Sequence, residues 1–386
     1  MNSRKITAFS LIGYFFIGAV PITLAPSLPY LIRDFNLSLA LAGTVFVARS
    51  AGTFLGVAAG GYLSDRLGRK PLMILGCLLQ GVFLALVGLS PDFLIITLLF
   101  GLIGFATGLV NPVFNALVAE VNQHRRAAAL NALHGVYSVG AMLGPIAAGL
   151  LLASRFGWRA IFFGGSLLWT VYGLSLFLVA IPRATRPKKQ DRDSTIASAG
   201  KHVKVLLLLL VLVSYLYNCT ATSLVNWINT YLDQVEFPVL LGAGMVSIFY
   251  LGLAIGRFAC GLLAEKTGYA RLILYCALGS LAFYPLAIYT TAPLLIAFGV
   301  FASGLCFSGL HPTSMAWANR LFPEKGGTIA SMMSIVMTLG AMSVPWLVGY
   351  AADRIGFRLS FSLNIALLVV LVFVASSLLA KEKVTA

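Results

Sequence analysis

The chain has 386 residues, of which 59% are hydrophobic and only 10% are charged. Soluble domains carry about 25% charged residues, so this composition excludes a water-soluble globular protein. The formal net charge of +15 raises the question of a nucleic-acid partner, which the placement of the charges answers below.

Apolar stretches long enough to cross a membrane recur twelve times along the chain. A hydrocarbon core of roughly 30 Å requires about 20 residues of helix, whereas strands of a closed barrel are shorter and alternate in polarity. The sequence therefore predicts an all-α membrane protein with twelve transmembrane helices. The expected spans cover residues 6–30, 39–63, 71–89, 94–118, 127–153, 160–181, 205–231, 240–264, 272–290, 294–318, 328–351 and 360–380.

The basic residues fall mainly on one side of this twelve-span arrangement. With both termini inside, twenty of the 27 Lys and Arg lie on the cytoplasmic side, five lie outside, and Arg49 and Arg257 lie within spans. Positive residues concentrate in cytoplasmic loops of membrane proteins. This asymmetry predicts a multi-pass protein of the plasma (inner) membrane with both termini cytoplasmic. Orientation accounts for the basic charge, and no nucleic-acid partner is expected.

The second half of the sequence repeats features of the first at an offset of about 200 residues. The matches include Gly61, Asp65, Arg66 and Gly68 with Gly261, Glu265, Lys266 and Gly268, Asn111-Pro112 with His311-Pro312, and Gly140-Ala141-Met142 with Gly340-Ala341-Met342. We predict two pseudo-symmetric six-helix bundles, residues 1–182 and 205–386, joined by a polar cytoplasmic linker of residues 183–204. Parallel repeats of this kind place a solute site near the membrane midplane between the halves.

The loop after the second span carries a motif of known type. Residues 61–70, GYLSDRLGRK, match the G-x-x-x-D-R-x-G-R-K motif of the major facilitator superfamily. With the weaker copy at residues 261–268 and the twelve spans, the whole chain resembles that superfamily. The resemblance implies an inner gate in which Asp65 faces a helix N-terminus while Arg66, Arg69 and Lys70 pair with acids. Gly61, Gly68, Arg257 and Glu265 are assigned to the same gate.

A second resemblance, to the branch that includes fucose and glucose proton symporters, rests on residues 130–134, 226–232 and 251–257. The chain departs from that branch because all twelve acids map to loops or helix ends, and the positions where the branch carries acids are Thr107 and Ala221. A carboxylate proton relay is therefore not expected, and neither is a cationic cargo, which usually needs an intramembrane acid.

Four ionisable residues remain within the spans, where such groups are functional by default. Arg49 either attracts an anionic or hydroxyl-rich solute or bonds to carbonyls and snorkels outward. His311, which the repeat pairs with Asn111, is the best candidate for a titratable solute contact and for coupling transport to protons. His134 is a second coupling candidate, with packing or gating as the alternative.

Polar side chains form a stripe on each of two spans at helical spacing. One stripe contains Asn111 and Asn115 after Thr107, and the other contains Asn218, Thr222, Asn226 and Asn229 beside Trp227. Amides next to aromatic faces are typical of carbohydrate sites, although Asn and Thr also hydrogen-bond helices to one another. We expect the span 7 stripe to face a solute cavity.

These patterns predict a secondary active or facilitative transporter of a small polar solute, a sugar or a sugar derivative, that works by alternating access. The alternatives are an efflux antiporter for an amphipathic or drug-like compound and a non-transporting sensor or scaffold. The expected partners are the solute, protons or another coupling ion, and the lipid bilayer, with a monomer as the functional unit. We expect no enzyme activity, catalytic residue, cofactor or metal, because no nucleotide, nucleophile or metal motif is present and all five cysteines lie in spans.

Overall fold

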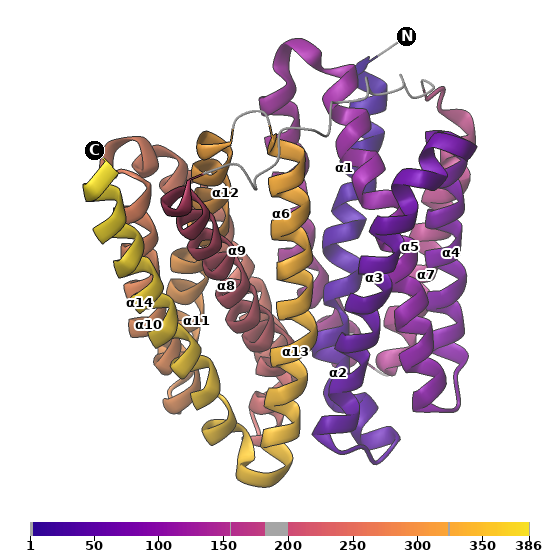
Figure 1. Ribbon diagram of the computed structural model, residues 1–386. Helices are drawn as coiled ribbons and strands as arrows, with labels where there is room; N and C mark the ends of the chain where they lie inside the picture. Colours follow the sequence, from indigo (N-terminus) through magenta and orange to yellow (C-terminus); the bar gives the residue numbers. More distant parts are fainter. Residues whose placement is uncertain (1–2, 155, 182–199, 323–324, 386) are drawn as a thin grey trace. The chain divides into compact units, whose positions relative to one another are not determined.

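A computed structural model describes residues 3–154, 156–181, 200–322 and 325–385, which are helical apart from short connections (Figure 1). The described residues contain no strand, so the all-α prediction is confirmed. The helices are α1 (Ser3–Ile22), α2 (Leu24–Asp34), α3 (Leu39–Leu67), α4 (Arg69–Leu89), α5 (Phe93–Val121), η1 (Gln123–Arg125), α6 (Arg126–Leu152), α7 (Gly157–Ser175), η2 (Leu176–Leu178), α8 (Lys201–Gln234), α9 (Val239–Thr267), α10 (Tyr269–Tyr289), α11 (Pro293–Phe307), α12 (Leu310–Leu321), α13 (Gly326–Ser360) and α14 (Ser362–Thr385).

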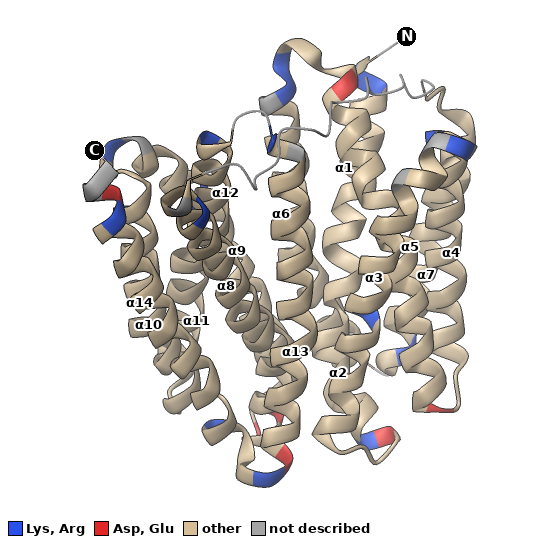
Figure 2. Ribbon diagram, viewed as in Figure 1, with Lys and Arg blue, Asp and Glu red and all other residues tan. Residues whose placement is uncertain are grey.

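Twelve segments of the described chain are long and apolar enough to cross a membrane, which confirms the predicted spans. Figure 2 shows that charged residues gather mainly at helix ends, as a hydrocarbon environment requires. The first span consists of α1 and α2, and the tenth consists of α11 and α12. The tenth is interrupted at Ser308 and Gly309, because the ring of Pro312 displaces the carbonyl four residues before it.

The backbone repeats the 200-residue offset of the sequence. Left-handed residues occur in pairs, at Asn36 and Glu236, with φ of 49° and 62°, and at Gly68 and Gly268, with φ of 84° and 83°. Gly157 and Gly356 form a third pair, with φ of 68° and 77°. Because few residues other than glycine adopt positive φ, their coincidence at equivalent positions shows that both halves turn alike at these helix ends.

Within each half, small residues bring the same helices together. A Cβ added at Gly52 or Gly104 would overlap a backbone carbonyl of the partner helix, which places α3 directly against α5. Gly252 and Gly304, 200 residues later, bring α9 against α11 in the same way. Small residues permit such close packing in membranes, where little hydrophobic force drives helix association.

The contacts divide the chain into two compact units, which are described separately. Unit 1 contains residues 1–186 and 226–247, and unit 2 contains residues 187–225 and 248–386. The second half of α8 and the start of α9 thus pack with the first six spans. The predicted linker, residues 183–204, lies outside the described residues as far as residue 199. The predicted bundle boundaries and membrane orientation stay predictions.

Candidate functional site

The motif segment of residues 61–70, expected to be a loop, instead forms the end of α3 and the start of α4, and it marks one end of unit 1, which we call the motif end. Gly68 turns the chain between α3 and α4 with a positive φ. Arg69, at the start of α4, is only 8% exposed and forms two hydrogen bonds with the carboxylate of Glu120 near the end of α5. This bidentate ion pair ties α4 to α5, and its planar geometry is one that arginine provides and lysine does not.

The other gate cations have different partners. Lys70 donates a hydrogen bond of 3.0 Å to the carbonyl of Phe177, and the guanidinium of Arg66 lies 4.4 Å from the centre of the Tyr62 ring. The side chains of Asp65 and Glu265 lie outside the part of the structure that is described, and Gly61 has no side chain that could pair. The inner-gate role of this loop therefore stays a prediction, supported by the Arg69 pair.

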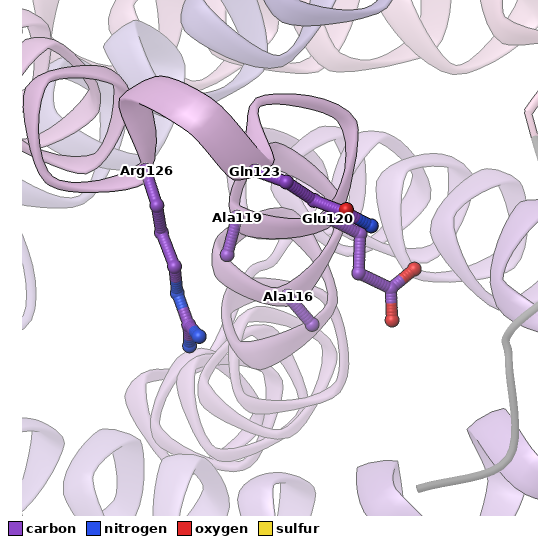
Figure 3. A pocket seen from close by; sticks show the side chains of 5 residues that line it. All are labelled: Ala116, Ala119, Glu120, Gln123 and Arg126. Atoms are coloured by element: carbon purple, nitrogen blue, oxygen red, sulfur yellow. The ribbon is translucent and has the colours of Figure 1, made fainter.

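A cavity of about 410 Å³ opens beside the Arg69 pair at the motif end. Its lining residues are Ala116, Ala119, Glu120, Gln123 and Arg126. Figure 3 shows Glu120 and Arg126 extending to either side of the wall that Ala116 and Ala119 form. The cavity thus carries opposite charges on its two flanks.

Deeper in unit 1, three polar side chains from α1 and α5 form the group that we call the Tyr14 cluster: Tyr14, Asn111 and Asn115. The Tyr14 hydroxyl donates to Asn111 Oδ1 at 2.8 Å and accepts from Asn115 Nδ2 at 2.8 Å. Asn115 Nδ2 also lies 3.0 Å from Asn111 Oδ1 and 2.9 Å from the Asn111 carbonyl. Tyr14 is 3% exposed, so this closed network satisfies groups that would be costly to bury alone.

Two rings of α6 extend the Tyr14 cluster. The Tyr14 ring meets His134 edge to face at 5.4 Å between centroids, and it lies 6.1 Å from Tyr137. His134 is exposed and Tyr137 is half-buried. Thr107, one turn before Asn111, donates instead to Gln80 on α4 at 3.1 Å. The predicted span 4 stripe therefore divides between two neighbouring helices.

Unit 2 carries an equivalent pair at the repeat positions. His311 Nδ1 lies 3.1 Å from Ser214 Oγ, and the imidazole ring lies nearly parallel to Tyr217 at 6.4 Å. Tyr14 and Asn111 are 97 residues apart in the sequence, and Ser214 and His311 are also 97 apart. Each unit thus joins its first span to the residue before a proline by a hydroxyl hydrogen bond.

The predicted span 7 stripe divides between the two units. In unit 2, Asn218 donates to the carbonyl of Met337 on α13, and Thr222 donates to the Asn218 carbonyl within α8. Both side chains are half-buried. The Asn218 bond joins α8 to α13, whereas the Thr222 bond lies within α8, so solute contacts of either residue would require exchange of these bonds.

The remaining stripe residues belong to unit 1. Trp227 is fully buried and meets Phe46 of α3 edge to face at 5.6 Å. Asn229 is 5% exposed, and its Nδ2 has no hydrogen-bond partner among the described residues. Asn226 is half-buried. The solute-binding role predicted for these three residues is not tested by these contacts.

The two arginines within spans are half-buried. Arg49 Nη1 donates to the carbonyl of Pro21 at 3.2 Å, at the point where α1 ends. A cation is favourable there because the last carbonyls of a helix carry partial negative charge. Arg257 lies on α9 in unit 2. Its neighbour Gly256 packs directly against Ser308, because a Cβ added at Gly256 would overlap Ser308 Oγ. The hydrogen bond to Pro21 supports the alternative in which Arg49 bonds to backbone carbonyls. Both arginines place a half-buried positive charge within a span.

Comparison with known proteins decides the family. The model of the Major Facilitator Superfamily matches residues 10–290 and 239–386, which together cover nearly the whole chain. The chain belongs to this superfamily. Its members are membrane transporters of small solutes and not enzymes, which confirms the family predicted from the motif and the fold predicted from the spans.

Individual relatives are distant but extend over most of the chain. The cis,cis-muconate transport protein of Acinetobacter baylyi is 26% identical over 374 residues, covering 92% of this chain and 88% of that protein. Sodium-dependent glucose transporter 1 of Xenopus laevis is 24% identical over 368 residues, covering 85% and 72%. The structure of a bacterial homologue of the human lysosomal transporter Spinster, inward-facing and unoccupied, superposes with a TM-score of 0.84 at 16% identity, covering 99% of this chain and 98% of that one.

Proposed function

We propose that this superfamily member is a secondary carrier of a small polar solute, a sugar or a sugar derivative, and that it works by alternating access. The observation that supports the proposal is the Tyr14 cluster, where one phenol and two amides converge from α1 and α5. The glucose transporter among its relatives is consistent with a hydroxyl-rich cargo.

The chemistry of the Tyr14 cluster suits vicinal hydroxyl groups. An amide offers a donor and an acceptor side by side, and a phenol offers one of each. The neighbouring rings of His134 and Tyr137 supply flat faces that can cover the apolar surface of a sugar ring. Because these groups are hydrogen-bonded to one another without a solute, binding would exchange one set of hydrogen bonds for another at small net cost.

His311 is proposed as the corresponding solute contact in unit 2. Its Nδ1 is already engaged with Ser214, which leaves Nε2 for a hydroxyl. Coupling to protons through His311 or His134 belongs to the same proposal, with another ion as the alternative. Uptake measured with and without a pH gradient tests it: dependence that His311→Asn abolishes assigns the coupling to His311, and unchanged dependence removes His311 from it.

Counterflow of labelled sugars in liposomes containing the purified protein tests the cargo. Asn111→Ala removes one or two hydrogen bonds of about 0.5–1.5 kcal/mol each, so we expect KM to rise roughly two- to tenfold or more. Thr107→Val is the matched control, because Thr107 bonds to Gln80 on the neighbouring helix. Absence of exchange with every sugar, or Asn111→Ala behaving like Thr107→Val, contradicts the proposal.

An organic carboxylate is the second candidate cargo, favoured by a different observation. Arg49 and Arg257 place half-buried positive charges within spans, and the relative from Acinetobacter baylyi transports muconate, by its name. The same liposomes test this cargo with labelled dicarboxylates. Exchange of a dicarboxylate that Arg49→Gln or Arg257→Gln abolishes, with no exchange of sugars, would establish the carboxylate in place of the sugar.

Efflux of an amphipathic or drug-like compound is the remaining alternative. It predicts that such a compound, and neither sugars nor dicarboxylates, drives exchange. We also propose that the protein is a monomer in the inner membrane with both termini cytoplasmic. Labelling of cysteines introduced singly at the two termini, in intact and in permeabilised cells, tests the orientation.

A further inference from the structure

Four of the five cysteines lie in unit 2, on α8, α9, α10 and α11, and two of them are in contact. Cys260 Sγ on α9 lies 3.9 Å from Cys276 Sγ on α10, and Cys260 Sγ lies 3.6 Å from Ser308 Oγ. The two cysteines are 8% and 6% exposed. Cys306, on α11, is only partly buried. This pair could not be predicted from the sequence because its members are 16 residues apart on separate spans.

The two sulfur atoms lie against the interruption of the tenth span. A Cβ added at Gly309 would be 2.7 Å from Cys260 Sγ and 2.8 Å from Cys276 Sγ. The space beside the Gly309 backbone is therefore taken by both thiols. His311 follows two residues later, so the thiol pair adjoins the segment that carries the proposed solute contact.

The ligand number of the site restricts the ions that it can hold. Among the described residues, no group of three or more His, Cys, Asp and Glu side chains is placed to hold a metal, so a tetrahedral zinc site is not available. Two thiols are sufficient for soft, thiophilic cations, which prefer thiolate ligands. A metal–thiolate bond measures about 2.3 Å for zinc. Two such bonds in line space the sulfurs roughly 4.6 Å apart, which a small rotamer adjustment reaches from 3.9 Å.

We propose that Cys260 and Cys276 form a two-coordinate site for a soft, thiophilic cation of the Hg²⁺ or Ag⁺ class. Binding replaces two S–H bonds with two metal–sulfur bonds and releases two protons, with no change of oxidation state. Cys260 lies about 10 Å along α9 from the end of that helix at Thr267. The bound ion links α9 to α10 and closes over the interruption at Ser308 and Gly309.

The test uses the full-length protein in detergent with Hg²⁺ as the probe. After incubation with one equivalent of Hg²⁺, the protein is treated with an alkylating agent under denaturing conditions that leave the metal bound, and each cysteine is mapped by mass spectrometry. We expect Cys260 and Cys276 to be protected while Cys77, Cys219 and Cys306 are alkylated. Protection of any other pair, or of none, overturns the proposal without requiring a variant.

Variants give an independent readout. Native mass spectrometry should find one Hg²⁺ per chain, with two protons lost, in the wild type and in the controls Cys77→Ser and Cys219→Ser. Cys260→Ser and Cys276→Ser each leave one thiol at the site, so Hg²⁺ bound there should displace one proton instead of two and should be removed by a lower concentration of a competing thiol. Zn²⁺ should give no protection of either thiol. Binding of Hg²⁺ with loss of two protons by the double variant Cys260→Ser, Cys276→Ser, or equal protection by Zn²⁺, contradicts a two-coordinate site.

Discussion

The ion pair between Arg69 and Glu120 allows the energetics of the motif end to be tested. We consider Glu120→Gln, which keeps the size of the side chain and removes its charge. The Arg69 side chain is 8% exposed and the Glu120 side chain 33% exposed. Removing one partner of a fully buried pair costs about 3–5 kcal/mol. Because Glu120 is a third exposed and Gln retains one acceptor for the guanidinium, we expect unit 1 to lose about 2 kcal/mol.

In a unit of this size, 1 kcal/mol shifts Tm by roughly 2–4 °C, so Glu120→Gln should melt about 4–8 °C below the wild type. The assay is thermal unfolding in detergent followed by tryptophan fluorescence. The control is Glu236→Gln, a change at an exposed acid of unit 1, which should shift Tm very little. The double variant Arg69→Gln, Glu120→Gln should be more stable than the sum of the single losses, because no unpaired charge is left. A Tm for Glu120→Gln equal to that of Glu236→Gln, or strictly additive losses, would refute this reasoning.

Three further changes probe other parts of the fold. Asp233→Asn removes the pair with Arg33, whose side chains are 25% and 54% exposed. The free energy of unfolding should fall by less than about 1 kcal/mol, with a correspondingly small decrease in Tm that vanishes at high salt. Asn364→Ala empties a fully buried site whose amide donates two hydrogen bonds. It should cost about 2–4 kcal/mol and reduce the yield of folded protein in size-exclusion chromatography. Gly104→Ala forces a Cβ into a facing carbonyl and should cost about 1–3 kcal/mol in the melting assay, whereas Gly164→Ala, which meets nothing within 4 Å, should leave Tm unchanged.

The helices could be predicted from the sequence because each span is a continuous apolar run, and a membrane admits few other structures. The interruption of the tenth span was not predicted, although Pro312 marks it. Pro112, at the equivalent position, lies within a continuous α5. A proline alone therefore does not identify an interrupted helix, because the cost depends on whether neighbouring helices support the freed backbone groups.

The candidate site could be predicted only in part. Polar spacing and the repeat identified Asn111 and His311, but not the hydroxyl groups that hold them. Tyr14 stands in the aromatic run of residues 14–16 and gives no polar signal of its own, and the choice of facing helix is a tertiary property. The sequence does contain one signal: Tyr14 and Ser214 are 200 residues apart, so the repeat places a hydroxyl group at the same position in both halves.

The two units use different contacts at an equivalent helix crossing. These contacts determine how easily the two helices of each crossing can separate. In unit 1, the absence of a side chain at Gly18 lets α1 approach the Tyr137 carbonyl of α6 directly. At the repeat positions in unit 2, Asn218 donates a hydrogen bond to the carbonyl of Met337. Close packing between backbones is lost when helices separate, and the looser contacts with lipid or water replace it only in part. A hydrogen bond can be exchanged for one to water or to a solute hydroxyl at little net cost. The α8 to α13 crossing is therefore expected to separate more readily than the α1 to α6 crossing, and the solute contact proposed for Asn218 would form by exchange of its bond to Met337.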